Sequence, residues 1–248
     1  MGAEPRWVVL AACLPVAEEA WIAAIARGFF ACCEAFGIDA IGGDTTRGPL
    51  NLCPTIFGEV PVGAAITRAG ARPGDDLWIS GAPGRAALGL AHLRGDLDLA
   101  PEHRDDCLAA LQRPQPRVAL GLALRGIAGA MLDVSDGLLG DLGHILELSR
   151  VSAVVEEAAL PIATLTAACG DPARALQACI AGGDDYELLF AAPATRRDDV
   201  GAISQRLGLP LHRIGRFTET AESLQLQGAD GSLRPASPRG YDHFGAGS

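Results

Sequence analysis

The segment that most constrains this fold is residues 131–138, MLDVSDGL, in which an apolar run ends abruptly in two aspartates and a serine. Apolar residues at helical spacing follow at once. This order predicts a buried strand, a tight turn and the start of a helix. Asp133 and Asp136 should then lie together at the end of the strand, and we expect Ser135 or Asp136 to cap the helix.

Such a turn suits a complex of a phosphate with a metal ion. The free backbone N–H groups at the start of a helix attract phosphate oxygens, and paired carboxylates bind a hard cation such as Mg²⁺. A helix cap with one surplus aspartate would give the same residues, so the interpretation depends on support from other segments.

Composition limits the classes of protein. The 248 residues are 49% hydrophobic and 20% charged, which is typical of a globular chain with one large domain or two smaller ones. The net charge is −10 without a basic cluster, which argues against nucleic acid as a partner. The chain contains no lysine. Arginine and a divalent cation would therefore have to neutralise any bound phosphate.

We expect a cytoplasmic protein. No apolar stretch reaches the ~18 residues of a membrane span, and residues 1–30 lack the features of a signal peptide. The seven cysteines are an odd number without a C-x-x-C motif, and most lie in apolar runs. Their expected role is that of small buried side chains in a reducing compartment.

The predicted strands and helices mix without strict alternation, so the expected fold class is α+β. The clearest elements are a buried strand, a helix, a short strand entering a glycine-rich segment, and an edge strand containing a proline: residues 7–14, 18–36, 38–41 and 50–60. The composition becomes turn-rich near Gly63, and we place a domain boundary there, between residues 1–62 and 63–248.

Two further segments have the same character as the first. Residues 42–48, GGDTTRG, combine glycines with a carboxylate, two hydroxyls and a guanidinium, which suit a polyphosphate and its metal but are also ordinary turn residues. Residues 182–187, GGDDYE, place three acids around an aromatic residue just before an apolar strand. Acids without basic partners repel each other unless a cation or a cationic ligand lies among them.

With these segments, the chain resembles the thiamine-monophosphate kinase family, in the superfamily that includes aminoimidazole ribonucleotide synthetase. Six pieces match in the family's order: IGGDTTRG at 41–48, TR at 67–68 with RPGD at 72–75, RPQPR at 113–117, LDVSDGL at 132–138 with DLGH at 141–144, GGDDYEL at 182–188 and GYDHF at 240–244. The resemblance implies a two-domain aminoimidazole ribonucleotide synthetase-like architecture, with an incomplete first domain.

The resemblance also implies a reaction, the ATP-dependent phosphorylation of thiamine phosphate to thiamine diphosphate by in-line transfer with several Mg²⁺ ions. Phosphoryl transfer depends mostly on positioning and charge neutralisation, so no covalent nucleophile is expected. By similarity, the ATP contacts are Gly43, Asp44, Arg68 and Ser135, the metal ligands are Asp44, Asp133 and Asp136, and the substrate contacts are Asp184 and Tyr241.

The chain departs from the family in two ways. Asp184 stands where the family usually has glutamate, so the substrate contact should be longer or bridged by water. Met1 aligns with the interior of the family's first domain, so acid-rich segments are missing and we expect weak or no kinase activity. The family's first domains pair, which predicts a homodimer with residues 7–14 and 50–60 at the interface.

Two other functions stay open. A sister ATP-dependent synthetase, acting on a purine precursor, a carbamoylated protein or selenide, should differ at the substrate loop. Selenide chemistry would also need a reactive N-terminal cysteine or a selenocysteine, which the sequence does not show. A non-catalytic remnant would bind nucleotide or thiamine without producing ADP.

Overall fold

A computed structural model describes residues 1–219 and 224–237 of the protein. The chain divides into two compact units, a smaller one of Ala3–Ala65 and a larger one of Ile66–Ser248 together with Met1–Gly2. In the described part of the chain, no helix combines the length and the apolar character needed to cross a membrane.

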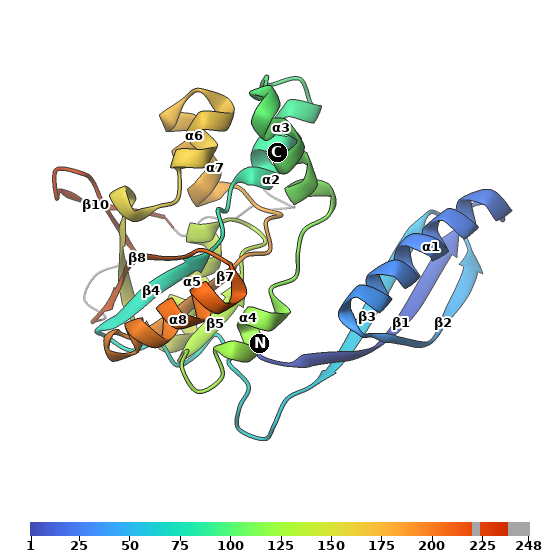
Figure 1. Ribbon diagram of the computed structural model, residues 1–248, viewed down its shortest axis with the longest axis horizontal. Coiled ribbons are helices and arrows are strands. Elements are labelled where there is room, and N and C mark those ends of the chain that lie inside the picture. Colours follow the sequence, from blue (N-terminus) through green and yellow to red (C-terminus); the bar gives the residue numbers. More distant parts are fainter. Residues whose placement is uncertain (220–223, 238–248) are drawn as a thin grey trace. The chain divides into compact units, whose positions relative to one another are not determined.

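The smaller unit is a three-stranded sheet with one long helix lying along it (Figure 1). Its elements are β1 (Glu4–Leu14), α1 (Glu19–Phe36), β2 (Asp39–Arg47) and β3 (Asn51–Glu59). The strand order is β2-β1-β3, with β1 parallel to β2 and antiparallel to β3. Helix α1 ends at Gly37, as its left-handed φ of 62° allows, and Pro54 lies on the edge strand β3, as predicted.

Strand β2 is longer than predicted. The glycines at 42–43 indicate a turn, but β2 continues through them to Arg47 and stays paired with β1. A Cβ atom on Gly43 would lie 2.1 Å from the carbonyl oxygen of Leu10. Gly43 therefore serves the close approach of two strands, and the segment that carries Asp44 is a strand and not a turn.

The larger unit is built on a seven-stranded sheet in the order β10-β9-β6-β8-β4-β7-β5, with β6 and β9 parallel and the other neighbouring pairs antiparallel. The strands are β4 (Asp75–Ser80), β5 (Ala130–Asp133), β6 (Ser152–Glu156), β7 (Leu188–Pro193), β8 (Leu211–Thr218), β9 (Gln225–Gln227) and β10 (Leu233–Pro235). The helices are α2 (Arg85–Leu93), α3 (Pro101–Gln112), α4 (Val118–Ala123), α5 (Leu138–Ser149), α6 (Ala163–Cys169), α7 (Pro172–Ala181) and α8 (Arg197–Leu207), with 3₁₀ turns η1 (Glu157–Ala159) and η2 (Ala194–Arg196).

Alternate residues of the central strands enter two separate cores. Leu77, Ile79 and Leu132 pack on one face of the sheet with α2, α3, α5, α6 and α7. Met131 and Phe190 pack on the other face with α4 and α8. The sheet is thus buried on both sides, which confirms the α+β class and explains why its central strands are continuous apolar runs.

Candidate functional site

Two of the acidic segments run side by side in the larger unit. Strand β5 pairs antiparallel with β7, and the segments that adjoin these two strands continue the hydrogen bonding. The N–H of Tyr186 donates to the Val134 carbonyl at 2.9 Å, and the N–H of Asp184 donates to the Ser135 carbonyl at 2.9 Å. Residues 182–187 therefore lie against the turn that follows β5.

The side chains of residues 182–187 alternate between the interior and solvent. Asp185 and Glu187 are buried, with 7% and 1% of their surfaces exposed, whereas Asp184 and Tyr186 are exposed. Asp184 and Tyr186 also adopt left-handed backbone conformations, with φ of 66° and 53°. Such a conformation costs a non-glycine residue on the order of 1 kcal/mol. Contacts made elsewhere in the segment must therefore hold it in place.

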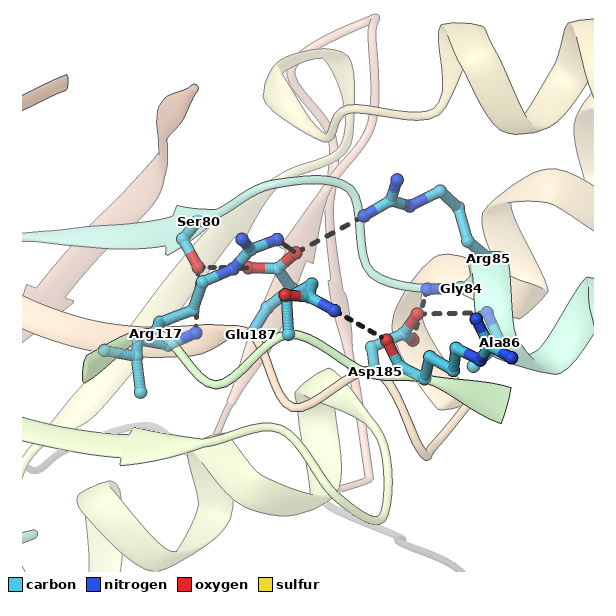
Figure 2. A network of polar contacts seen from close by, with 10 residues as sticks. Ser80, Gly84, Arg85, Ala86, Arg117, Asp185 and Glu187 are labelled. Atoms are coloured by element: carbon cyan, nitrogen blue, oxygen red, sulfur yellow. Dashed lines mark hydrogen bonds and ion pairs between the residues drawn. The ribbon is translucent and has the colours of Figure 1, made fainter. Parts of the chain in front are cut away.

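Asp185 is held by the start of helix α2. Its carboxylate accepts hydrogen bonds from the backbone N–H groups of Gly84, at 2.5 Å, and Ala86, at 3.1 Å (Figure 2). Burial raises the pKa of Asp185 to about 6, although these N–H groups and the charge of Arg85 act in the opposite direction. Above that pH the carboxylate is ionised, and the positive end of the helix dipole favours its charge.

Glu187 is bound by three side chains that point toward it from β4, from α2 and from the residue before α4 (Figure 2). Ser80 donates its hydroxyl at 2.5 Å, Arg117 donates from Nε at 2.8 Å and from Nη2 at 2.6 Å, and Arg85 donates from Nη2 at 3.5 Å. The hydrogen bonds to Glu187 raise the pKa of Arg117. Charge-assisted, bidentate bonds of this kind offset the cost of burying the carboxylate.

The turn after β5 is not capped as predicted. The N-cap of α5 is Gly137, with φ of 113°, so the expectation of a Ser135 or Asp136 cap is wrong. Asp141, inside the helix, instead accepts the N–H groups of Ser135 at 2.9 Å and Asp136 at 3.0 Å. Asp141 is 3% exposed, and burial raises its pKa, as do the charges of Asp136 and Asp133. A carboxylate from within the helix thus fixes the backbone of the turn.

Acidic side chains gather around Tyr186. Burial raises its pKa, and the charges of Asp184, Asp133 and Asp136 raise it further. Within residues 1–219 and 224–237, no three His, Cys, Asp or Glu side chains are grouped to hold a metal ion by themselves. Mg²⁺ usually keeps several waters and binds one or two carboxylates together with substrate phosphates. The half-buried Asp133 and Asp136 fit a site of that kind.

The remaining assigned residues lie elsewhere. Gly43 and Asp44 are exposed on β2 of the smaller unit, where the Asp44 carboxylate accepts the N–H of Thr45 at 2.8 Å. Arg68 is exposed in the larger unit. The carbonyl of its neighbour Thr67 accepts a hydrogen bond from the N–H of Met131 on β5. Tyr241 lies outside the described residues.

Sequence reasoning did not assign roles to Asp185, Glu187 or Arg117, although all three lie in segments that it singled out. A spacing pattern could not indicate that Arg117 of RPQPR pairs with Glu187 of GGDDYE, because 70 residues separate them. A cavity of about 540 Å³ borders the hydrogen bonds of Glu187. Its lining includes Arg85, Arg117, His103 and His212. None of the assigned site residues lines that cavity.

Family profiles match both parts of the chain. The AIR synthase related protein N-terminal domain matches residues 1–60, and the C-terminal domain of the same family matches residues 72–227.

Individual relatives agree with this assignment. The thiamine-monophosphate kinase of Escherichia coli strain K12 is 40% identical over 98% of this chain and 75% of its own. A crystal structure of the enzyme of the same name from Stenotrophomonas maltophilia K279a is 45% identical, with a TM-score of 0.86 over 93% of this chain and 73% of that one. A structure of AaThiL complexed with AMPPCP and TMP is 26% identical, with a TM-score of 0.83 over 98% of this chain and 75% of that one.

Proposed function

Because the chain belongs to the thiamine-monophosphate kinase family of AIR synthase related proteins, we propose that it transfers a phosphoryl group from ATP to thiamine phosphate and forms thiamine diphosphate. One observation carries the proposal: residues 182–187 are hydrogen-bonded to the turn after β5. This pairing brings a candidate acceptor-binding segment beside a candidate metal- and phosphate-binding turn. Direct transfer between two phosphates depends on such positioning.

On the donor side, Asp133 and Asp136 would hold Mg²⁺ in the larger unit. In the smaller unit, Asp44 would act as a metal ligand. Mg²⁺ bound there would neutralise negative charge on the phosphates. The hydroxyl of Ser135 would be an ATP contact of the larger unit, and the backbone at Gly43 would be one of the smaller unit. Because the chain has no lysine, the guanidinium of Arg68 would supply the cationic side chain for the nucleotide phosphates.

On the acceptor side, Asp184 would contact thiamine phosphate together with Tyr241. The thiazolium ring of thiamine carries a positive charge, and the exposed carboxylate of Asp184 lies among other acids around Tyr186. A cationic ligand would relieve the repulsion among these carboxylates. The transfer itself needs no covalent nucleophile from the protein.

We also propose that the smaller unit pairs with a second copy of the chain. Strands β2 and β3, together with the residues that flank β3, expose large apolar side chains, namely Ile41, Leu50, Leu52, Ile56, Phe57 and Val60. Exposed apolar patches of this kind mark interaction surfaces. Light scattering coupled to gel filtration should give twice the chain mass of 25.6 kDa. A monomer at micromolar concentration would contradict this part of the proposal.

Incubation with ATP, MgCl₂ and thiamine phosphate, followed by chromatography, tests the activity. Whatever the rate of turnover, we expect ADP and thiamine diphosphate to form in equal amounts, and neither product when EDTA is present. Thiamine in place of thiamine phosphate should give no product, which would separate this reaction from phosphorylation of the free vitamin. ATP binding without ADP production would contradict the kinase and favour the nucleotide-binding remnant.

A further inference from the structure

We propose that Asp185 and Glu187 are positioning residues. They hold residues 182–187 so that Asp184 and Tyr186 are presented to thiamine phosphate, the phosphoryl acceptor. The inference rests on the proposed function and deepens it, because it concerns how the acceptor segment is shaped. Neither buried carboxylate is expected to touch the substrate.

Residues 184–187 alternate in both exposure and backbone conformation. Asp184 and Tyr186 are exposed and left-handed, whereas their neighbours Asp185 and Glu187 are buried. A free chain would leave the left-handed region, since extended and right-handed conformations are more favourable for these residues. The buried side chains fix the backbone on both sides of Tyr186, which prevents this relaxation.

Both buried carboxylates are bound by groups on well-packed elements of the larger unit. Asp185 accepts two backbone N–H groups from the start of α2, and Glu187 accepts a bidentate pair from Arg117 and the Ser80 hydroxyl. Helix α2 and strand β4 both contribute side chains to the core that also contains α5. The segment is therefore fastened to the same packed body as the turn that carries Asp133 and Asp136.

The buried charges of this segment favour one conformation of its backbone. A buried ion pair adds little net stability compared with apolar side chains of similar size, and its best-attested effect is to select one arrangement. Here the arrangement selected is the alternation that directs Asp184 outward. Removing an anchor should therefore weaken the binding of thiamine phosphate, in addition to any stability that is lost because its buried partners are left unsatisfied.

The variant Asp185→Asn tests this, with Asp171→Asn as the matched control. Asp171 also accepts two backbone N–H groups at the start of a helix, those of Ala173 at 2.9 Å and Arg174 at 3.3 Å, but it caps α7 on the surface. At pH 8 we expect Asp185→Asn to lower kcat/KM for thiamine phosphate about 10- to 100-fold, mainly through KM. Asp171→Asn should stay close to the unsubstituted chain, and KM for ATP should change little in either variant.

A double-mutant cycle shows whether Asp185 acts through Asp184. In an Asp184→Ala background, Asp185→Asn should lower kcat/KM by less than about 3-fold, because Asp184, the proposed contact of thiamine phosphate in this segment, is already gone. Effects that simply multiply would overturn the proposal. So would an Asp185→Asn enzyme that loses stability but keeps its KM for thiamine phosphate.

Hydrogen exchange provides a readout that does not depend on activity. The N–H groups of Asp184 and Tyr186 are bonded to the turn after β5, so a peptide covering 182–187 should exchange slowly. Exchange there should accelerate in Asp185→Asn and in Glu187→Gln but not in Asp171→Asn. Unchanged exchange would overturn the inference. An inactive chain that showed the expected exchange would contradict the proposed function alone.

Discussion

The guanidinium of Arg117 binds the carboxylate of Glu187 through two hydrogen bonds, Nε to Oε2 at 2.8 Å and Nη2 to Oε1 at 2.6 Å. Glu187 is 1% exposed, and Arg117 precedes helix α4. The pair therefore ties the connector at 113–117 to the end of the candidate acceptor segment.

Arg117→Lys should lower the free energy of unfolding by about 1–3 kcal/mol, because one ammonium cannot reproduce the bidentate bonds to a buried carboxylate. Urea unfolding monitored by circular dichroism measures this change in the free energy of unfolding. Arg104→Lys is the control, since Arg104 pairs with Asp105 at 3.1 Å on the surface. That variant should change stability by less than about 0.5 kcal/mol. Equal effects in the two variants would contradict the strength assigned to the buried pair.

Asp185 should make stability depend on pH. Its folded-state pKa of about 6 lies above the ordinary value of 3.8, so the folded protein retains this proton more tightly than the unfolded chain. The resulting stabilisation is fully present below about pH 4 and is lost as the pH rises through about 6. It should amount to at most on the order of 2–3 kcal/mol. Of the facing charged groups, Arg85 lowers the pKa of Asp185 and Glu187 raises it. The thiols of Cys107 and Cys179 stay neutral throughout this pH range.

Unfolding free energies measured from pH 4.5 to 7.5 for the unsubstituted chain and for Asp185→Asn isolate this contribution. The difference between the two proteins should shift across the window in favour of Asp185→Asn as the pH rises. A difference that is independent of pH would show that Asp185 titrates near its ordinary value.

Gly183→Ala should disturb the pairing of the two acidic segments. The added Cβ would lie 2.3 Å from the Ser135 carbonyl oxygen, which accepts the N–H of Asp184. We expect a loss of about 1–3 kcal/mol in stability and a weaker affinity for thiamine phosphate. Gly201→Ala is the control, because an added Cβ in helix α8 meets nothing within 4 Å. It should stabilise the protein by about 0.4–1 kcal/mol. A Gly183→Ala protein as stable as the parent would contradict the close approach.

Asp133→Asn and Asp136→Asn should each lower kcat about 100-fold or more while leaving stability unchanged or slightly higher. Removing one carboxylate would weaken the binding of the Mg²⁺ that neutralises charge on the phosphates, but it would also relieve repulsion within the acidic cluster. Steady-state assays over a range of MgCl₂ concentrations, together with thermal melts, measure the two effects. Asp198→Asn, exposed in the first turn of α8, should match the unsubstituted enzyme in both. Loss of activity through unfolding would contradict the ligand role.

The sequence by itself determined the local elements and the acidic turn. The apolar run and helical spacing around residues 131–138 correctly predicted β5, the turn and α5, and the spacing at 18–36 predicted α1. These features depend on neighbouring residues along one strand or helix, which is the information that periodicity carries. The same local reasoning failed at β2, because pairing with β1 overrode the turn preference of two glycines.

Only the tertiary structure decided which acids in GGDDYE are exposed and which are buried. Left-handed residues at 184 and 186 and the anchors at Asp185 and Glu187 set that alternation, and their partners lie about 70 to 107 residues away along the chain. Asp141 likewise replaced the expected cap by reaching back to Ser135 and Asp136. Buried carboxylates must find hydrogen-bond donors wherever the packed chain supplies them. The sequence shows that a buried acidic residue needs hydrogen-bond donors, and the tertiary structure determines which donors it has.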